Sequence, residues 1–222
     1  MTRQILAIVA KDLTLERRSK ASLNALIFLS GLILVIISFA LGPDAARLRA
    51  AAGAVLWIAF AFAGVLAFAR AYQTESENRC FEGMLLAGAD PRAIYLGKLT
   101  ATVIVMLVME AVVTISMALL YGLQIGSVAV QLFAILALGT AGIASVGIVY
   151  GRLTMTLRAR EVMLPLLVFP VVIPAILAGV KATSLALAGS TGQLGIWLEL
   201  LAIFDVVFIT VGLLTYETLC RE

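Results

Sequence analysis

Six long apolar stretches constrain the fold of this chain more than any other feature of its sequence. A helix needs about 20 consecutive apolar residues to cross a bilayer core of about 30 Å, and each stretch is of about that length. Their approximate limits are Leu23–Leu41, Ala50–Ala69, Leu99–Tyr121, Val128–Tyr150, Val162–Val180 and Leu194–Tyr216. The stretches are continuously apolar, whereas the strands of a membrane β-barrel alternate. We therefore predict an all-α integral membrane protein with six transmembrane helices.

The composition supports this class and excludes a soluble globule. Hydrophobic residues make up 63% of the 222 residues and charged residues 13%, and the mean hydropathy is +1.11. A soluble domain is roughly 45–50% apolar and needs more polar groups to cover its surface. Histidine is absent, which excludes His-centred catalysis and imidazole metal sites. Cys80 and Cys220 are far from a Cys-x-x-Cys spacing, which argues against a redox or zinc site.

Lysine and arginine are distributed unevenly between the two sides of the predicted membrane domain. Thirteen of the 16 basic residues lie in the N-terminal tail, in the loops after the second and fourth spans, and in the C-terminal tail. The opposite side holds Arg47, Arg49 and Lys181. Basic loops remain in the cytoplasm. We therefore predict that both termini are cytoplasmic.

The N-terminal residues 1–22 have the pattern of an amphipathic helix. An apolar residue recurs every four positions from Ile5 to Leu13, while Lys11 and Arg18 fall on another face. Such a helix lies in the membrane interface with its basic side chains towards anionic lipid headgroups. The alternative interpretation is a solvated basic tail.

The loop between the second and third spans, which we call the 71–98 connector, is the larger polar segment on the same side. Acidic and polar residues come first, followed by apolar residues at helical spacing. The residues of interest are Glu75, Arg79, Phe81, Glu82, Met84 and Leu85. A short amphipathic helix with an apolar knob and a charged rim is typical of a segment that docks into a groove of a partner. An ordinary solvated connector explains the pattern equally well.

These segments divide the chain into three parts. Residues 1–22 form the interfacial helix, and residues 23–216 form the six-helix transmembrane domain that includes the 71–98 connector. Residues 217–222 form a cytoplasmic tail.

Carboxylates inside the apolar stretches are candidates for buried polar contacts. Glu110 lies near the middle of the third span and Asp205 lies in the sixth. An unpaired charge at the bilayer centre costs about 2.5–3.5 kcal/mol on insertion scales, and we find no lysine or arginine deep in a span to pair with them. Glu199 is closer to the outer interface, where it reaches water.

Glycine and proline set the expected packing of the fourth and fifth spans. Gly147 and Gly151 form a Gly-x-x-x-Gly pair, which lets helices approach closely. Pro165, Pro170 and Pro174 each remove a backbone donor from the fifth span, so we expect a kink whose irregular backbone faces protein or a cavity. A moving or substrate-adjacent segment is the sharper alternative to simple kinked packing.

Known catalytic motifs are missing from the sequence. Gly97-Lys98 lacks the upstream glycine of a phosphate-binding loop, and neither Gly-x-Ser-x-Gly nor His-Glu-x-x-His occurs. We therefore expect a membrane protein that is not an enzyme and that is driven by a partner.

Three segments carry a resemblance to a known family. They are RAYQTESENRCFEGMLLAG after the second span, LALGTAGIASVGIVYG in the fourth, and LRAREVMLPLLVFPVVIPAIL leading through the fifth. With them the chain resembles the CcmB family, the heme exporter protein B of bacterial cytochrome c maturation. That family is an ABC-transporter permease subunit with a type-2 exporter-like fold. The resemblance extends over nearly the whole chain.

The resemblance implies a function and a set of partners. Residues 73–87 would be the coupling helix that inserts into the ATPase subunit CcmA, and CcmC, CcmD and the heme chaperone CcmE would be further partners. The complex, in the bacterial inner membrane, would couple ATP hydrolysis by the partner to heme export or to release of the heme-loaded chaperone. ATP would bind the partner, and heme would be cargo of the complex rather than a cofactor of this chain. No nucleic acid is expected.

Three other functions agree with the six-span pattern. One is a type-2 ABC exporter permease for a lipid, a glycan or a drug, which shares the leader helix and the coupling helix. Another is an ATP-independent channel or assembly scaffold. A membrane enzyme comes third, because the sequence shows no catalytic cluster.

Overall fold

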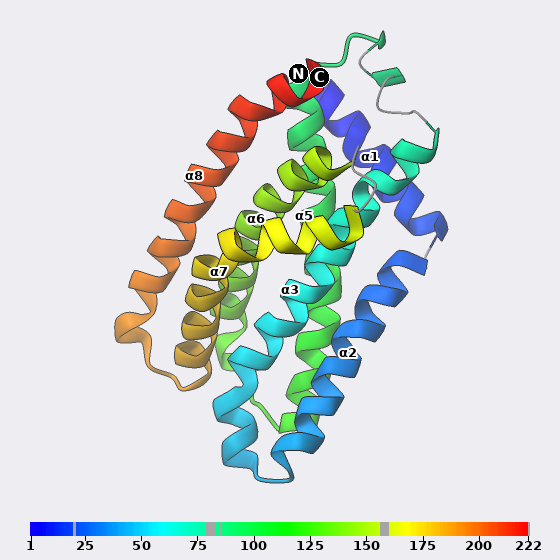
Figure 1. Cartoon of the computed structure of the whole chain (residues 1–222). Coiled ribbons are helices and arrows are strands. Elements are labelled where there is room, and N and C mark those ends of the chain that lie inside the picture. The colour runs from blue at the N-terminus through cyan, green and yellow to red at the C-terminus, as the bar shows by residue number, and fades with distance from the viewer. Residues whose placement is uncertain (20, 79–82, 85, 156–159, 222) are drawn as a thin grey trace.

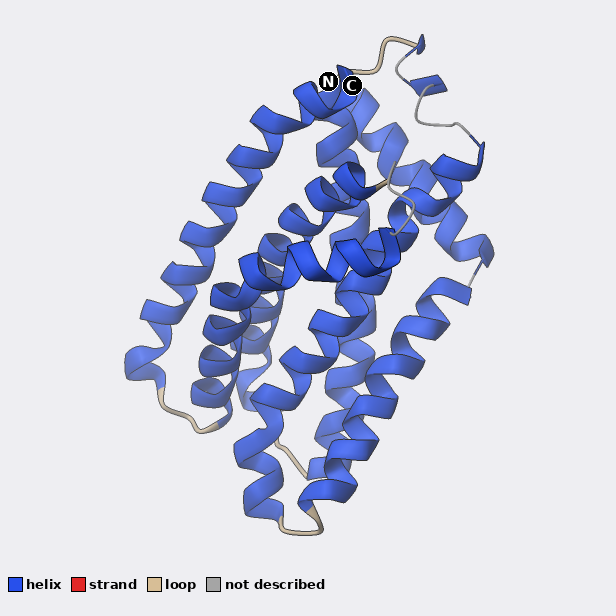
Figure 2. Cartoon of the chain, in the orientation of Figure 1, coloured by secondary structure: helices blue, strands red, loops and turns tan. Residues whose placement is uncertain are grey.

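The computed structural model is a bundle of long helices and describes residues 1–19, 21–78, 83–84, 86–155 and 160–221. Its labelled helices are α1 (Thr2–Ser19), α2 (Ala21–Leu41), α3 (Ala45–Asn78), α5 (Pro91–Tyr121), α6 (Ala129–Thr154), α7 (Arg160–Leu187) and α8 (Leu194–Arg221). The 3-10 turns η1 (Gly126–Val128) and η2 (Thr191–Gln193) precede α6 and α8. In this described part of the chain, every regular element is helical and no strand occurs (Figure 2).

Six of these helices are long and apolar enough to cross a membrane: α2, α3, α5, α6, α7 and α8. They form one elongated bundle, and both termini lie at the same end of it, which we call the termini end (Figure 1). The remaining labelled helix, α1, also lies at the termini end and packs mainly on α5 (Figure 1). The prediction of an all-α membrane protein with six spanning helices is therefore confirmed.

Several helices continue beyond the apolar stretches that marked them in the sequence. α3 has 34 residues and runs to Asn78, past the predicted limit at Ala69. α7 runs to Leu187, so Lys181 lies within this helix and not in the loop after it. Hydropathy marks the part of a helix that suits lipid, whereas the backbone remains helical until a capping or turn residue ends it.

The bounds of α5 show how capping residues decide where a helix begins and ends. The helix begins at Pro91 rather than at Leu99, because the Asp90 side chain caps it by accepting a hydrogen bond of 2.9 Å from the Arg92 backbone N–H. It ends before Gly122, which has a left-handed backbone with φ 62°, a conformation that favours glycine at a helix terminus. About two turns of helix, residues 91–98, therefore precede the apolar run.

The core of the bundle contains a tryptophan enclosed by two glycines. Trp57 of α3 is fully buried, and a Cβ atom at Gly139 of α6 or at Gly179 of α7 would collide with its ring. The indole Nε1 donates a hydrogen bond of 2.9 Å to Thr183 Oγ1 of α7. Three spanning helices thus meet at the Trp57 side chain. The ring fits there because Gly139 and Gly179 have no side chains.

The glycine pair of α6 also receives aromatic rings. A Cβ atom at Gly147 would collide with the ring of Phe68, and one at Gly151 would come within 2.9 Å of the ring of Tyr72. Both rings belong to α3. The close packing expected at these glycines is therefore between α6 and the aromatic face of α3.

The helix with three prolines is bent. Figure 1 shows the first part of α7 crossing the bundle and the last part running down beside α6. The bend agrees with a helix that carries Pro165, Pro170 and Pro174 in its interior. Within this single chain, the rings of Pro170 and Pro174 are exposed and Pro165 is half-buried. Ile173 and Leu177, on the outer side of α7, are exposed as well. The expectation that the irregular backbone of this helix faces protein or a cavity stays a prediction.

The leader helix α1 packs against the bundle with a face that includes polar residues. Ile8 is buried, and its side chain lies against Gly97 of α5, where a Cβ atom would come within 2.8 Å of it. Lys11, expected on the headgroup side, is half-buried and faces protein, while Leu6 and Leu15 are exposed. One side of α1 therefore faces protein and includes the polar Lys11, while the exposed leucines lie on the rest of its surface.

Candidate functional site

A buried polar region of the described chain surrounds Lys98 at the termini end. The Lys98 side chain is fully buried. Its Nζ donates a hydrogen bond of 2.9 Å to the Ala71 carbonyl of α3 and lies 3.7 Å from Asp12 Oδ2 of α1. The same ammonium lies 4.7 Å from the centroid of the Tyr72 ring. We call these four residues the Lys98 junction; it joins α1, α3 and α5 through one cation.

Three tyrosines extend this junction to α6 and α8. The Tyr72 hydroxyl donates to the Ile148 carbonyl at 2.9 Å and lies 3.0 Å from the Tyr216 hydroxyl. Since the hydrogen of Tyr72 goes to the carbonyl, Tyr216 is the donor to Tyr72. The Tyr95 ring contacts the Tyr216 ring at a tilt of 44°, with 5.4 Å between ring centroids, and the Tyr95 hydroxyl donates to the Ser145 carbonyl at 3.4 Å. Five helices are therefore connected by hydrogen bonds, an ion pair and ring contacts in one region.

α1 also contacts the far limb of the 71–98 connector. Gln4 Nε2 donates to the Gly88 carbonyl, and Gln4 Oε1 accepts from the Asp90 backbone N–H, both at 3.4 Å. Lys11 Nζ lies 3.9 Å from Met84 Sδ. The connector is thus braced by α1 where it returns to α5 and, through Lys98, where it leaves α3.

The structure describes part of the predicted docking segment. Met84 is half-buried and packs against the core. Glu75 lies in α3, but its side chain is outside the described residues. Four other predicted residues also lie outside them: Arg79, Phe81, Glu82 and Leu85. Leu86, which the sequence analysis did not single out, is 90% exposed and is the most exposed large apolar side chain of the described chain.

The two intramembrane carboxylates lie on either side of α6. Glu110 of α5 is 1% exposed, and its Oε1 accepts a hydrogen bond of 2.6 Å from Thr140 Oγ1 of α6. Asp205 of α8 is 7% exposed and lies against Gly142 of α6. Among the described residues, Glu110 Oε2 and Asp205 Oδ1 have no hydrogen-bond partner. The structure does not bring the two carboxylates together, and Lys98 is twelve residues, or about 18 Å of helix, from Glu110.

A substitution series at Glu110 tests its buried contact. We expect Glu110→Gln to retain near-normal thermal stability in detergent, because the amide oxygen accepts the same bond from Thr140. Glu110→Leu removes the acceptor and is expected to cost about 1–3 kcal/mol. Equal unfolding temperatures for the two variants would show that the bond contributes nothing.

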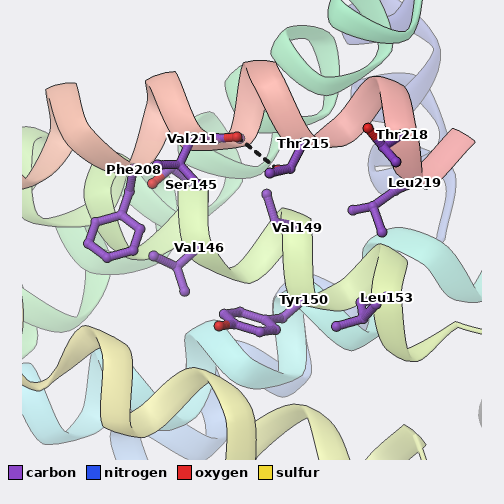
Figure 3. A pocket seen from close by; sticks show the side chains of 11 residues that line it. Ser145, Val146, Val149, Tyr150, Leu153, Phe208, Val211, Thr215, Thr218 and Leu219 are labelled. Carbon is purple, nitrogen blue, oxygen red and sulfur yellow. Dashed lines mark hydrogen bonds between the residues drawn. The ribbon is translucent and has the colours of Figure 1, made fainter.

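A groove of about 420 Å³ lies between α6 and α8 near the termini end. Figure 3 shows Val146, Val149 and Phe208 among its apolar lining, with Tyr150 at its edge. The Thr215 hydroxyl donates to the Val211 carbonyl of its own helix at 2.8 Å, as the dashed line marks (Figure 3). The groove therefore offers apolar contact rather than a set of reactive groups. Over the described residues, no group of three or more His, Cys, Asp or Glu could hold a metal ion.

The fold and the Lys98 junction define a multi-pass helical membrane protein whose connector between the second and third spanning helices is braced by an N-terminal helix. A family model described as CcmB protein matches residues 3–219, and the chain belongs to this family. A curated relative, the heme exporter protein B of Bradyrhizobium diazoefficiens, is 25% identical over 211 residues, which are 93% of this chain and 92% of the relative. The resemblance found in the sequence is thereby confirmed.

Sequence reasoning missed the residues that form the junction. Lys98 was counted as a loop cation, because it precedes the apolar run that begins at Leu99. The structure places it inside the spanning helix α5 and buries it, whereas Lys181 of α7 is exposed. Asp90-Pro91 does indicate a helix start seven residues before Lys98, but no local pattern shows that the lysine is buried.

Proposed function

We propose that this chain is the transmembrane permease subunit of an ABC transporter complex that serves heme export during cytochrome c maturation. Membership of the CcmB family and the name of its curated relative support this proposal. The termini end would face the cytoplasm of the bacterial inner membrane, since the basic residues gather on that side. The chain itself would not be an enzyme; a separate ATP-binding subunit, CcmA in the family, would hydrolyse ATP.

The 71–98 connector would be the place where this ATPase binds. The single observation that carries the assignment is the position of Leu86: a 90% exposed leucine on the connector at the termini end. An exposed apolar side chain on a connector outside the spanning helices suits a hydrophobic groove of a partner. Met84 behind it is held by α1, which would give the docked segment a firm base.

ATP binding to the partner would act on the helix bundle through thermodynamic linkage. Nucleotide binding brings ATPase subunits together, and a docked connector then favours one packing of the bundle over another. Only a difference in affinity between the two packings can shift their populations. The connector is joined directly to α3 and α5, so a displacement of it acts first on these two helices.

The heme-handling step would depend on the other subunits. The chain has no histidine, the residue that most often binds heme iron in proteins. We therefore favour a role in which ATP hydrolysis releases the heme-loaded chaperone CcmE from the complex with CcmC and CcmD. Passage of heme through the bundle is the competing version of the same function.

Purification of the tagged chain in mild detergent, with subunits identified by mass, tests this function. We expect an ATP-binding subunit and cytochrome c maturation proteins to copurify, and we expect a deletion strain to lose mature c-type cytochromes. A complex without a nucleotide-hydrolysing subunit would contradict the permease assignment and favour an ATP-independent scaffold. An ATPase partner combined with normal cytochromes in the deletion strain would favour a type-2 exporter of a lipid, glycan or drug.

A further inference from the structure

A fully buried lysine restricts how its surroundings can move. The Lys98 side chain has no exposed surface, and an ammonium without water is stable only while its partners stay in place. Those partners come from different elements: the Ala71 carbonyl from α3 and the Asp12 carboxylate from α1. Pulling either element away from α5 would take one of these partners from a buried charge.

The same elements meet at further points along α1. Ile8 lies on Gly97, one residue before the lysine, with no room for a side chain between the two helices. Gln4 bonds to both Gly88 and Asp90 at the far limb of the connector. α1 is therefore fixed directly to the far limb of the connector and to α5, and it is linked to the limb that leaves α3 only through Lys98.

We propose that Lys98 is a positioning residue that makes α1, the end of α3 and the start of α5 move as one rigid unit. The inference rests on the proposed docking of an ATPase on the 71–98 connector. A push on the connector would then carry the whole of α1 along the membrane surface instead of bending the connector alone. α1 would serve as a moving part of the transport cycle and not as a fixed anchor.

The contacts of the unit indicate the direction in which it transmits movement. Tyr72 directly follows Ala71 and is bonded to Tyr216 of α8 and to the Ile148 carbonyl of α6. α7 contributes no residue to the junction within the described chain. Distances from α1 to α5 should therefore stay constant during the cycle, while distances from α1 to α7 should change.

Pulsed electron spin resonance on the full complex with its ATPase tests this inference. One spin-label pair is placed at the exposed Leu6 of α1 and Thr100 of α5, and a second pair at Leu6 and Ile173 of α7, after both native cysteines are changed to serine. Addition of a non-hydrolysable ATP analogue should leave the first distance unchanged and shift the second. A second distance that does not respond to nucleotide would overturn the proposal.

Lys98→Met is the critical variant. We expect the ATPase to copurify with it, the Leu6–Thr100 distances to broaden, and the nucleotide-dependent shift of the Leu6–Ile173 distance to disappear. The yield of mature cytochrome c should fall by about tenfold, a typical strength of coupling between sites. Asp12→Ala removes one partner at a less buried position and should change the same readouts in the same direction, so it serves if Lys98→Met does not fold. A normal nucleotide-dependent shift in both variants would overturn the role of Lys98.

The matched control is Lys181→Met, which removes an exposed lysine of α7. It should leave both distances and the cytochrome yield unchanged; a loss equal to that of Lys98→Met would mean that the effect is not specific to the junction and would overturn the proposal. A wild-type complex that contains no ATPase would instead contradict the docking function itself, before any variant is made.

Discussion

Replacing Leu86 by aspartate is expected to remove the partner ATPase from the purified complex while the six-span protein remains in the membrane. Leu86 is 90% exposed, so replacing it should change the stability of the folded chain only slightly. In a docked complex the same side chain would be buried in an apolar groove, where a carboxylate would lack both water and a partner. The loss of a central apolar contact costs at least about 2 kcal/mol, which is about thirtyfold in the dissociation constant.

The measurement is the ratio of ATPase to tagged chain after affinity purification. Leu86→Met is the matched control, because it retains an apolar side chain of similar size and should retain the ATPase. Phe81→Asp, at the neighbouring predicted position, should behave like Leu86→Asp. An undiminished ratio in both aspartate variants would contradict the docking assignment.

The spanning helices could be predicted from the sequence because lipid imposes one simple requirement. Each helix must present about 20 apolar residues to the bilayer, and the six apolar runs correspond to the six spanning helices. The helix ends could not be read from hydropathy alone. α5 gains its first turns from the Asp90 cap, and its polar start at Arg92 and Lys98 hides that helix from an apolar window.

The junction could not be predicted, because it depends on which helices are neighbours. Asp12 and Lys98 are 86 positions apart in the chain, and nothing in either local pattern links them. The sequence pattern of residues 1–22 predicts an amphipathic helix with Lys11 towards the lipid headgroups. In the structure the Lys11 ammonium lies 3.1 Å from Asp12 and 3.9 Å from Met84 Sδ, so this side chain contacts protein.

Replacing Gly139 by leucine is expected to be the most damaging single change inside the membrane domain. A Cβ atom alone at this position would collide with the Trp57 ring. The ring cannot move aside for two reasons. Gly179 of α7 also lies directly against the ring, so closely that a Cβ atom there would collide with it. The indole N–H is in addition hydrogen-bonded to Thr183. Overpacking in a core that can partly adjust costs about 1–3 kcal/mol. Here the ring is enclosed by two helices, so we expect a loss at or above the upper limit of that range.

Thermal unfolding in detergent and the yield of folded protein measure this loss. Gly31→Leu in α2 is the matched control, since no atom lies within 4 Å of a Cβ at Gly31, and it should leave the unfolding temperature near that of the wild type. Combining Gly139→Leu with Trp57→Leu should recover part of the stability, because the smaller side chain makes room for the new one. Recovery is the decisive observation: a double variant no more stable than Gly139→Leu would show that the glycine serves something other than the tryptophan. It would also mean that α6 and α3 approach each other for a reason unrelated to the packing of Trp57.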